Sequence, residues 1–100
     1  MYKRQADGVL TAVAKAVSGD KFGIVLYTGE VPEITSNEVV TETGKVVLPA
    51  LGKNAAGIYA VEVQDVKDFI SGTVNVKAYA YDKAEGTYKL SDDVVSVVIE

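Results

Sequence analysis

Short apolar segments alternate with turn residues along the whole chain. Clusters containing glycine recur about every eight to twelve residues, the spacing typical of an all-β sandwich or barrel. The clusters are Ser18-Gly19-Asp20, Thr28-Gly29-Glu30, Thr43-Gly44-Lys45, Gly52-Lys53-Asn54, Ser71-Gly72 and Ala84-Glu85-Gly86. This pattern predicts an antiparallel, all-β fold of about seven strands.

The clearest predicted strand is TVNVKAYAYD, residues 73–82. Its apolar and polar positions alternate strictly, and successive side chains of a strand point to opposite faces. We therefore expect Val74, Val76, Ala78 and Ala80 to face the core and Asn75, Lys77, Tyr79 and Tyr81 to face away from it.

Five more strands follow from the same criteria. The continuous apolar run FGIVLYT (22–28) predicts a central strand, and Pro49 should end the strand in GKVVLPAL (44–51) or lie on an edge, since proline donates no hydrogen bond. In GIYAVEVQDV (57–66), Tyr59, Val61 and Val63 share one face. TYKLS (87–91) returns from the loop DKAEG, and DDVVSVVIE (92–100) forms a last strand whose two faces both look partly covered.

The segment GVLTAVAKAV, residues 8–17, fits two patterns. Leu10, Val13, Ala14 and Val17 have helical spacing, whereas Val9, Thr11, Val13, Lys15 and Val17 have strand spacing. We favour a strand because the rest of the chain is strand-like and because Ser18-Gly19-Asp20 suits a hairpin turn.

The composition of the chain limits the cellular environments and the classes of partner that can be expected. The formal net charge is −4, which disfavours binding to nucleic acid or anionic lipid. No apolar run approaches the roughly 20 residues that span a bilayer, so membrane insertion is not expected. The chain has no cysteine, which is compatible with the cytosol and also with secretion by bacteria that build surface proteins without disulfides.

The residue inventory excludes several kinds of active site. Without His or Cys, there can be no Ser/His/Asp triad, Cys/His pair or zinc site with imidazole or thiolate ligands. Oxygen ligands alone can bind calcium, but the chain lacks EF-hand spacing. The paired acids fall in predicted turns, where they should be solvated: Asp65 with Asp68, Asp82 with Glu85, and Asp92 with Asp93. We expect no catalytic residue, cofactor or metal.

Three tyrosines form the one candidate ligand site. Tyr79 and Tyr81 point away from the expected core, and Tyr88 lies across the hairpin from them. An exposed stripe of these rings can stack on a sugar or a partner surface. The alternative, which we favour, is that the rings pack across strands and fix the register.

Several short motifs carry a resemblance to a known family. They are Phe22-Gly23, Gln64-Asp65-Val66, Lys77-Ala78-Tyr79, Tyr81-Asp82, Glu85-Gly86, Tyr88, Ser91-Asp92 and Val95-Ser96. With these motifs, residues 20–100 resemble a β-sandwich module found at the C-termini of secreted Firmicutes surface proteins. The resemblance implies an immunoglobulin-like or fibronectin-III-like fold, an extracellular location and no catalytic role. The chain departs from fibronectin III in having no Trp and in placing Gly72 where that family has a tyrosine.

The basic leader MYKRQ lies outside this pattern. Tyr2 to Gln5 resemble the translated end of a transposon adapter used to fragment DNA for sequencing. We therefore interpret residues 1–5 as a non-native leader on a metagenomic fragment and expect them to make no core contact.

Residues 6–100 are then one β-sandwich domain, the C-terminal module of a longer protein. The expected function is that of a spacer or adhesion domain of a secreted or surface protein, with neighbouring domains as partners. The alternative function is carbohydrate or cell-wall binding through Tyr79, Tyr81 and Tyr88.

Overall fold

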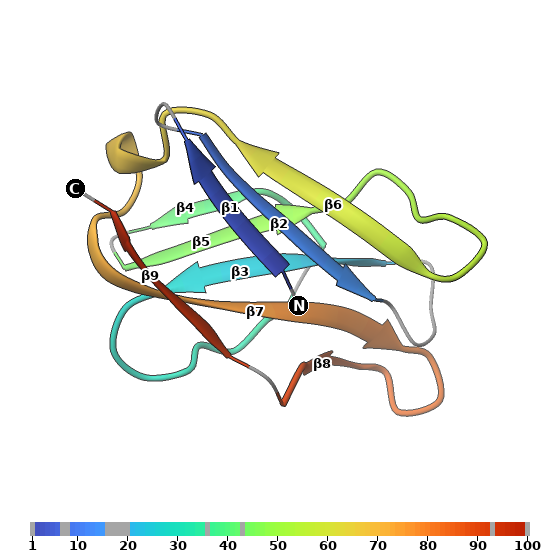
Figure 1. The fold of residues 1–100 in the computed structure, drawn as a ribbon. Helices are drawn as coiled ribbons and strands as arrows, with labels where there is room; N and C mark the ends of the chain where they lie inside the picture. The colour runs from blue at the N-terminus through green and yellow to red at the C-terminus, as the bar shows by residue number, and fades with distance from the viewer. Residues whose placement is uncertain are drawn as a thin grey trace.

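The computed structural model describes residues 2–6, 9–15, 21–35, 37–42, 44–92 and 94–99, and the side chains of residues 2–6, 9 and 15 lie outside the description. The fold is nearly all-β, as the sequence predicts (Figure 1). Nine strands are described instead of about seven, since Tyr2–Ala6 and Val40–Glu42 are strands that the pattern did not indicate. The elements are β1 (Tyr2–Ala6), β2 (Val9–Lys15), β3 (Phe22–Tyr27), β4 (Val40–Glu42), β5 (Lys45–Pro49), β6 (Ile58–Val63), the 3₁₀ turn η1 (Val66–Asp68), β7 (Gly72–Asp82), β8 (Thr87–Leu90) and β9 (Val95–Ile99).

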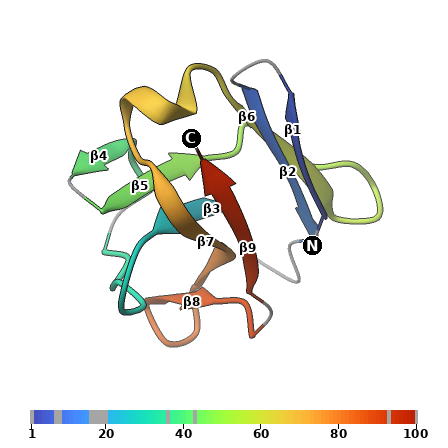
Figure 2. The same ribbon diagram turned by 60° about the vertical axis from the view of Figure 1, so that its left-hand side comes forward.

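The strands form two antiparallel sheets, which are seen from two sides in Figures 1 and 2. The smaller sheet has the order β1-β2-β6. The larger sheet has the order β4-β5-β3-β7-β8, and β9 pairs with β7 as well. Because β7 is 11 residues long, β8 pairs with its C-terminal part and β9 with its N-terminal part along one side.

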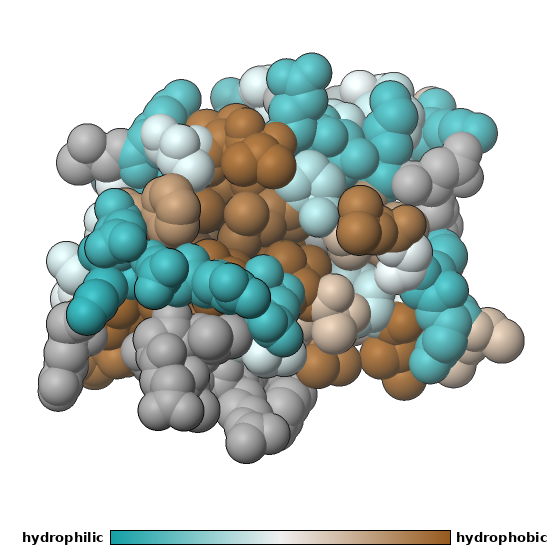
Figure 3. Space-filling view, turned by 90° about the horizontal axis from the view of Figure 1, so that it is seen from above, coloured by the Kyte–Doolittle hydropathy of each residue, from teal (hydrophilic) through white to brown (hydrophobic). Residues whose placement is uncertain are grey.

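The facing sides of the two sheets share one hydrophobic core. Alternate residues of β2, β6, β7 and β9 are buried there, which is the arrangement that the alternation in residues 57–66 and 73–82 predicts. Leu10, Ile24, Leu26, Val46, Tyr59, Val61, Val63, Val74, Val76, Val97 and Ile99 belong to this core. On the face seen from above, hydrophobic residues gather toward the middle, with hydrophilic residues on both sides of them (Figure 3).

A second, smaller core lies on the other face of the larger sheet. It consists of Val25, Tyr27, Ile34, Val47 and Tyr79. Ile34 comes from the outer loop, defined as residues 28–39 with Ser36 outside the described residues, and it is 7% exposed. Because this loop covers the sheet, all six residues of β3 are buried, and the apolar run FGIVLY forms the central strand that the sequence predicts.

β2 is a strand, as favoured over the helix, but the expectation that a hairpin follows it was wrong. Its buried face consists of Leu10, Ala12 and Ala14, which alternate with Thr11 and Val13. β2 forms no hairpin with β3: it pairs with β1 and β6 in the smaller sheet, while β3 pairs with β5 and β7 in the larger one. The chain therefore crosses between sheets after β2, and the predicted turn at 18–20 lies outside the described residues.

The last strand is covered on one face only, which corrects the expectation that both faces are partly covered. Val97 and Ile99 are buried in the main core, whereas Val94 and Val98 are 51% and 61% exposed. The outer loop packs over β3, β5 and the C-terminal part of β7, so it leaves the outer face of β9 open to solvent. Pro49, in contrast, ends β5 as predicted.

The leader contributes backbone to the smaller sheet. Tyr2–Ala6 pairs antiparallel with Val9–Val13, which places β1 at the edge next to β2. Since the side chains of residues 2–6 lie outside the description, the expectation that the leader makes no core contact stays a prediction, as does its interpretation as non-native.

Tyr59 links the two sheets and should make the fold sensitive to alkali. Its hydroxyl donates a hydrogen bond to the Gly23 carbonyl oxygen at 2.7 Å, and burial raises its pKa from 10.0 to about 12. The unfolded chain then loses this proton at a lower pH than the folded one does. The free energy of unfolding should be unaffected by this group below about pH 10 and should fall by up to about 1.4 kcal/mol per pH unit between about pH 10 and 12.

Urea denaturation at a series of alkaline pH values measures this effect. Tyr59→Phe should lower the stability near neutral pH through the lost hydrogen bond and should also flatten the alkaline decline. An equal slope in wild type and variant would show that Tyr59 titrates alike in the folded and unfolded chains.

Candidate functional site

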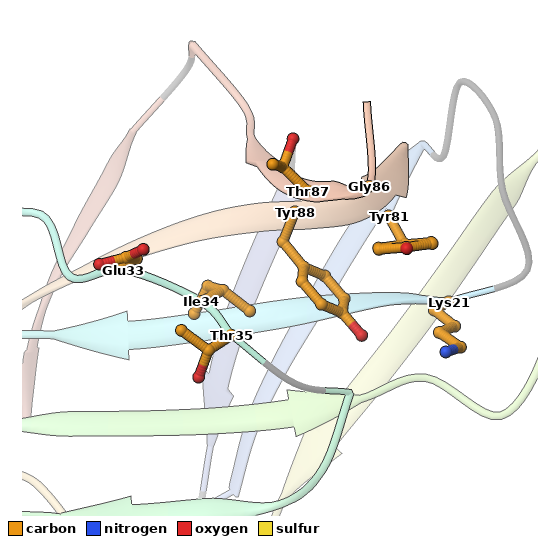
Figure 4. A pocket seen from close by; sticks show the side chains of 8 residues that line it. All are labelled: Lys21, Glu33, Ile34, Thr35, Tyr81, Gly86, Thr87 and Tyr88. Atoms are coloured by element: carbon orange, nitrogen blue, oxygen red, sulfur yellow. The ribbon is translucent and has the colours of Figure 1, made fainter. Parts of the chain in front are cut away.

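The candidate site is an open pocket of about 450 Å³ on the outer face of the larger sheet. It is bounded by the outer loop, the start of β3 and the β7–β8 hairpin (Figure 4). The lining residues are Lys21, Glu33, Ile34, Thr35, Tyr81, Gly86, Thr87 and Tyr88.

The hairpin positions the two pocket tyrosines. Tyr81 on β7 and Tyr88 on β8 are directly paired, so their side chains emerge on the same face of the sheet. Their ring centroids are 4.9 Å apart at an interplanar angle of 53°. Asp82 closes the turn, because its Oδ1 accepts a hydrogen bond from the Ala84 N–H at 2.9 Å. The register of the hairpin thus holds both rings beside each other.

Tyr79 is not part of an exposed stripe, so the candidate ligand face loses this residue; its ring instead packs against Tyr88 of the neighbouring strand, in agreement with the alternative that the sequence analysis favours. Its side chain is 1% exposed and lies in the second core. Its ring contacts Tyr88 at a centroid distance of 5.8 Å, and its hydroxyl donates a hydrogen bond to Asn37 Oδ1 at 2.7 Å. Burial raises the pKa of Tyr79 well above its ordinary value, and nearby Tyr88 and Tyr59 add to the rise. Tyr79 therefore supports the pocket from below and presents no ring face to a ligand.

Tyr81 and Tyr88 are half-buried and remain accessible at the pocket. In Figure 4, Tyr88 points from β8 toward the pocket, with Ile34 and Thr35 on one side and Tyr81 and Lys21 on the other. The Lys21 Nζ lies 5.1 Å from the centroid of the Tyr81 ring, which is within the range of a cation–π interaction. Two aromatic rings thus stand beside hydroxyl groups and a cation.

The outer loop is held in place from two strands. Lys45 Nζ on β5 donates a hydrogen bond to the Glu33 carbonyl oxygen at 2.9 Å, and Tyr79 on β7 holds Asn37. Between these anchors, Ile34 is buried against the sheet. The wall of the pocket that carries Glu33 and Thr35 is therefore fixed by side chains far away in sequence.

Sequence reasoning identified Tyr81 and Tyr88 but missed Lys21, Glu33, Ile34 and Thr35. These four residues come from a loop and a strand start that are distant from the hairpin in sequence. The one sequence feature that indicates contact between this loop and the sheet is Ile34, a single large apolar residue within the polar stretch PEITSNE.

Most of the paired acids are exposed residues at turns, as expected, but Asp82 is the last residue of β7 and is half-buried. Asp65, Asp68, Glu85 and Asp92 are exposed, and Asp93 lies outside the described residues. Glu85 forms an exposed ion pair with Lys89 at 2.6 Å. Within the described ranges, no three His, Cys, Asp or Glu side chains are placed to hold a metal ion.

A second open pocket of about 430 Å³ lies beside η1. Its lining includes Phe69, which is 45% exposed, together with Lys67 and Asp68. It contains a single aromatic ring, whereas the first pocket contains two adjacent ones. The tyrosine pocket is therefore the better candidate for binding a flat ligand.

Comparisons with protein-family models, curated proteins and solved structures found no match to this chain. Among the described residues, no helix is long and apolar enough to cross a membrane.

Proposed function

We propose that this chain is an immunoglobulin-like module without catalytic activity that serves as a spacer or adhesion domain of a larger secreted or surface protein of bacteria. The strand order is the observation that carries this proposal. Lettered along the chain, β2 and β6 correspond to strands B and E, and β5, β3, β7 and the β8–β9 pair correspond to C′, C, F and G. β1, which consists mostly of the leader, lies beside β2 where strand A would lie. An A-B-E sheet facing a C′-C-F-G sheet is the arrangement of immunoglobulin-like and fibronectin-III-like domains, with β4 as an addition at the C′ edge.

The coding sequence that flanks this chain tests the proposal. We expect the reading frame upstream of Ala6 to continue into at least one further domain, preceded by a secretion signal. An in-frame stop codon directly upstream, followed by a start codon, would contradict the modular assignment.

The tyrosine pocket favours a second candidate function, which is recognition of a carbohydrate or cell-wall glycan. Tyr81 and Tyr88 offer ring faces on which a sugar ring can stack. Thr35, Thr87 and the tyrosine hydroxyls can exchange hydrogen bonds with sugar hydroxyl groups. Glu33 is the one carboxylate among the lining residues, whereas glycoside hydrolysis by the usual route uses two. The proposed role is therefore binding.

Binding to an array of soluble glycans and peptidoglycan fragments tests this candidate. We expect Tyr81→Ala to weaken a positive signal by about fivefold or more, since loss of an aromatic contact costs about 1–3 kcal/mol. Phe69→Ala is the matched control, because it removes an exposed aromatic ring at the other pocket and should leave binding unchanged. Equal binding by wild type and Tyr81→Ala would exclude the tyrosine pocket as the site.

A further inference from the structure

β9 is an edge strand with one unpaired side. It pairs only with β7 among the described strands, while β8 occupies the adjoining part of the same β7 edge. An edge strand presents a row of backbone N–H and C=O groups that can pair with another strand.

The hydrogen-bond pattern identifies which groups of β9 are free. The Ser91 N–H donates to the Ala78 carbonyl oxygen, and the Tyr81 N–H donates to the Lys21 carbonyl oxygen on the other side. Even-numbered residues of β7 therefore direct their backbone groups toward β8 and β9. Because Val74 pairs with Val97, residues 95, 97 and 99 of β9 bond to β7, and the backbone groups of Ser96 and Val98 point outward.

β9 lacks the features that usually protect an edge strand. Natural edge strands carry charged residues, prolines or bulges that discourage pairing. The sequence from Val94 to Ile99 is VVSVVI, which has no charge and no proline. The other edge strands of the described sheets each contain a charged residue: β1 has Lys3 and Arg4, β4 has Glu42, β6 has Glu62, and β8 has Lys89.

The residues of β9 whose backbone groups point away from β7 are also the residues whose side chains lie on the open face of the strand. Val94 and Val98 are 51% and 61% exposed, and Ser96 between them is exposed as well. If two copies of β9 lie antiparallel with Ser96 opposite Ser96, then Val94 of each copy lies opposite Val98 of the other. This register pairs the free backbone groups with one another and also places valine against valine on the open face.

We propose that β9 is a homotypic interaction site, at which a second copy of this chain pairs edge to edge around a two-fold axis at Ser96. The self-complementary register is the reason for choosing a second copy over an unrelated strand. One continuous sheet would then cross the interface of a symmetric dimer, in which both copies use the same surface. Each copy carries a formal charge of −4, so the dimer should become stronger as added salt screens the repulsion.

Sedimentation equilibrium of the whole chain over a range of concentrations tests the association. We expect a reversible dimer whose Kd rises by about tenfold or more in Val98→Lys, which places a charge at the edge. Ser96→Pro should have a similar effect, because it removes an outward N–H and proline is tolerated on sheet edges. Val39→Lys is the matched control, since Val39 is 67% exposed and lies away from β9, and it should leave the Kd unchanged.

A single-cysteine variant tests the register directly. The chain has no native cysteine, so mild oxidation of Ser96→Cys reports only on this position. Residues directly opposite in a hydrogen-bonded antiparallel pair have Cα atoms about 5.5 Å apart, which a disulfide can span. We expect rapid formation of a covalent dimer by Ser96→Cys and slow formation by Val39→Cys. A wild type that stays monomeric at every soluble concentration, or equal cross-linking of the two variants, would overturn the proposal.

Discussion

Gly23→Ala should destabilise this chain by about 3 kcal/mol or more, and a loss of that size is a large part of the stability of a small domain. Gly23 lies in β3, the central strand of the larger sheet, between Pro49 on β5 and Tyr79 on β7. A Cβ atom built at this position overlaps the Leu48 carbonyl oxygen and lies 2.8 Å from both Pro49 Cα and the Tyr79 hydroxyl. Since two of these neighbours are backbone atoms of a paired strand, the strain cannot be relieved by a side-chain rotation.

Gly52→Ala is the matched control for this substitution. A Cβ atom at Gly52 meets no atom within 4 Å, so the change should alter the free energy of unfolding by less than about 1 kcal/mol. Urea or thermal denaturation of the two variants beside the wild type measures the difference. Equal stabilities of the two variants would mean that β3 and β5 can separate enough to admit a methyl group. The Phe22-Gly23 motif thus has a packing explanation, since only glycine fits where β5 approaches so closely.

Tyr79→Ala should cost about 3–5 kcal/mol, because it removes a fully buried aromatic ring. This ring packs with Val25, Val47 and Ile34, and its hydroxyl holds Asn37 of the outer loop. Its removal would leave a cavity beneath that loop and take away one of the loop's two anchors.

Tyr79→Phe separates packing from hydrogen bonding at the same position. It keeps the ring and loses only the bond to Asn37, so the expected cost is about 1 kcal/mol. Tyr81→Ala provides a second comparison, because Tyr81 lies on the same strand but is only half-buried and should cost clearly less than Tyr79→Ala. Chemical denaturation of the three variants gives the order. Similar losses for the alanine and phenylalanine variants of Tyr79 would show that the second core contributes little to stability.

The sequence predicted only part of the candidate site, because only part of it is formed by strands that are close together in the sequence. Tyr81 and Tyr88 are paired across a short hairpin, and hairpin pairing follows from local turn signals and alternation. Glu33 and Thr35 reach the pocket because the outer loop folds across the sheet, and Lys21 reaches it because the start of β3 pairs with β7. That path depends on contacts of Ile34, Lys45 and Asn37 with residues far away in sequence, which no local pattern records.

The amino-acid sequence by itself determined seven of the nine described strands and most of their inner faces. Strict alternation in β6 and β7, the apolar run of β3 and the position of Pro49 each reflect local backbone geometry, which has a period of two residues. Only the tertiary structure decided which strands became neighbours and which outer faces were covered. β2 joined β6 instead of β3, Tyr79 became buried beneath the outer loop, and Val94 and Val98 stayed exposed. The physical reason is that alternation specifies the face on which a side chain lies, whereas the strand or loop that covers this face is selected by long-range packing.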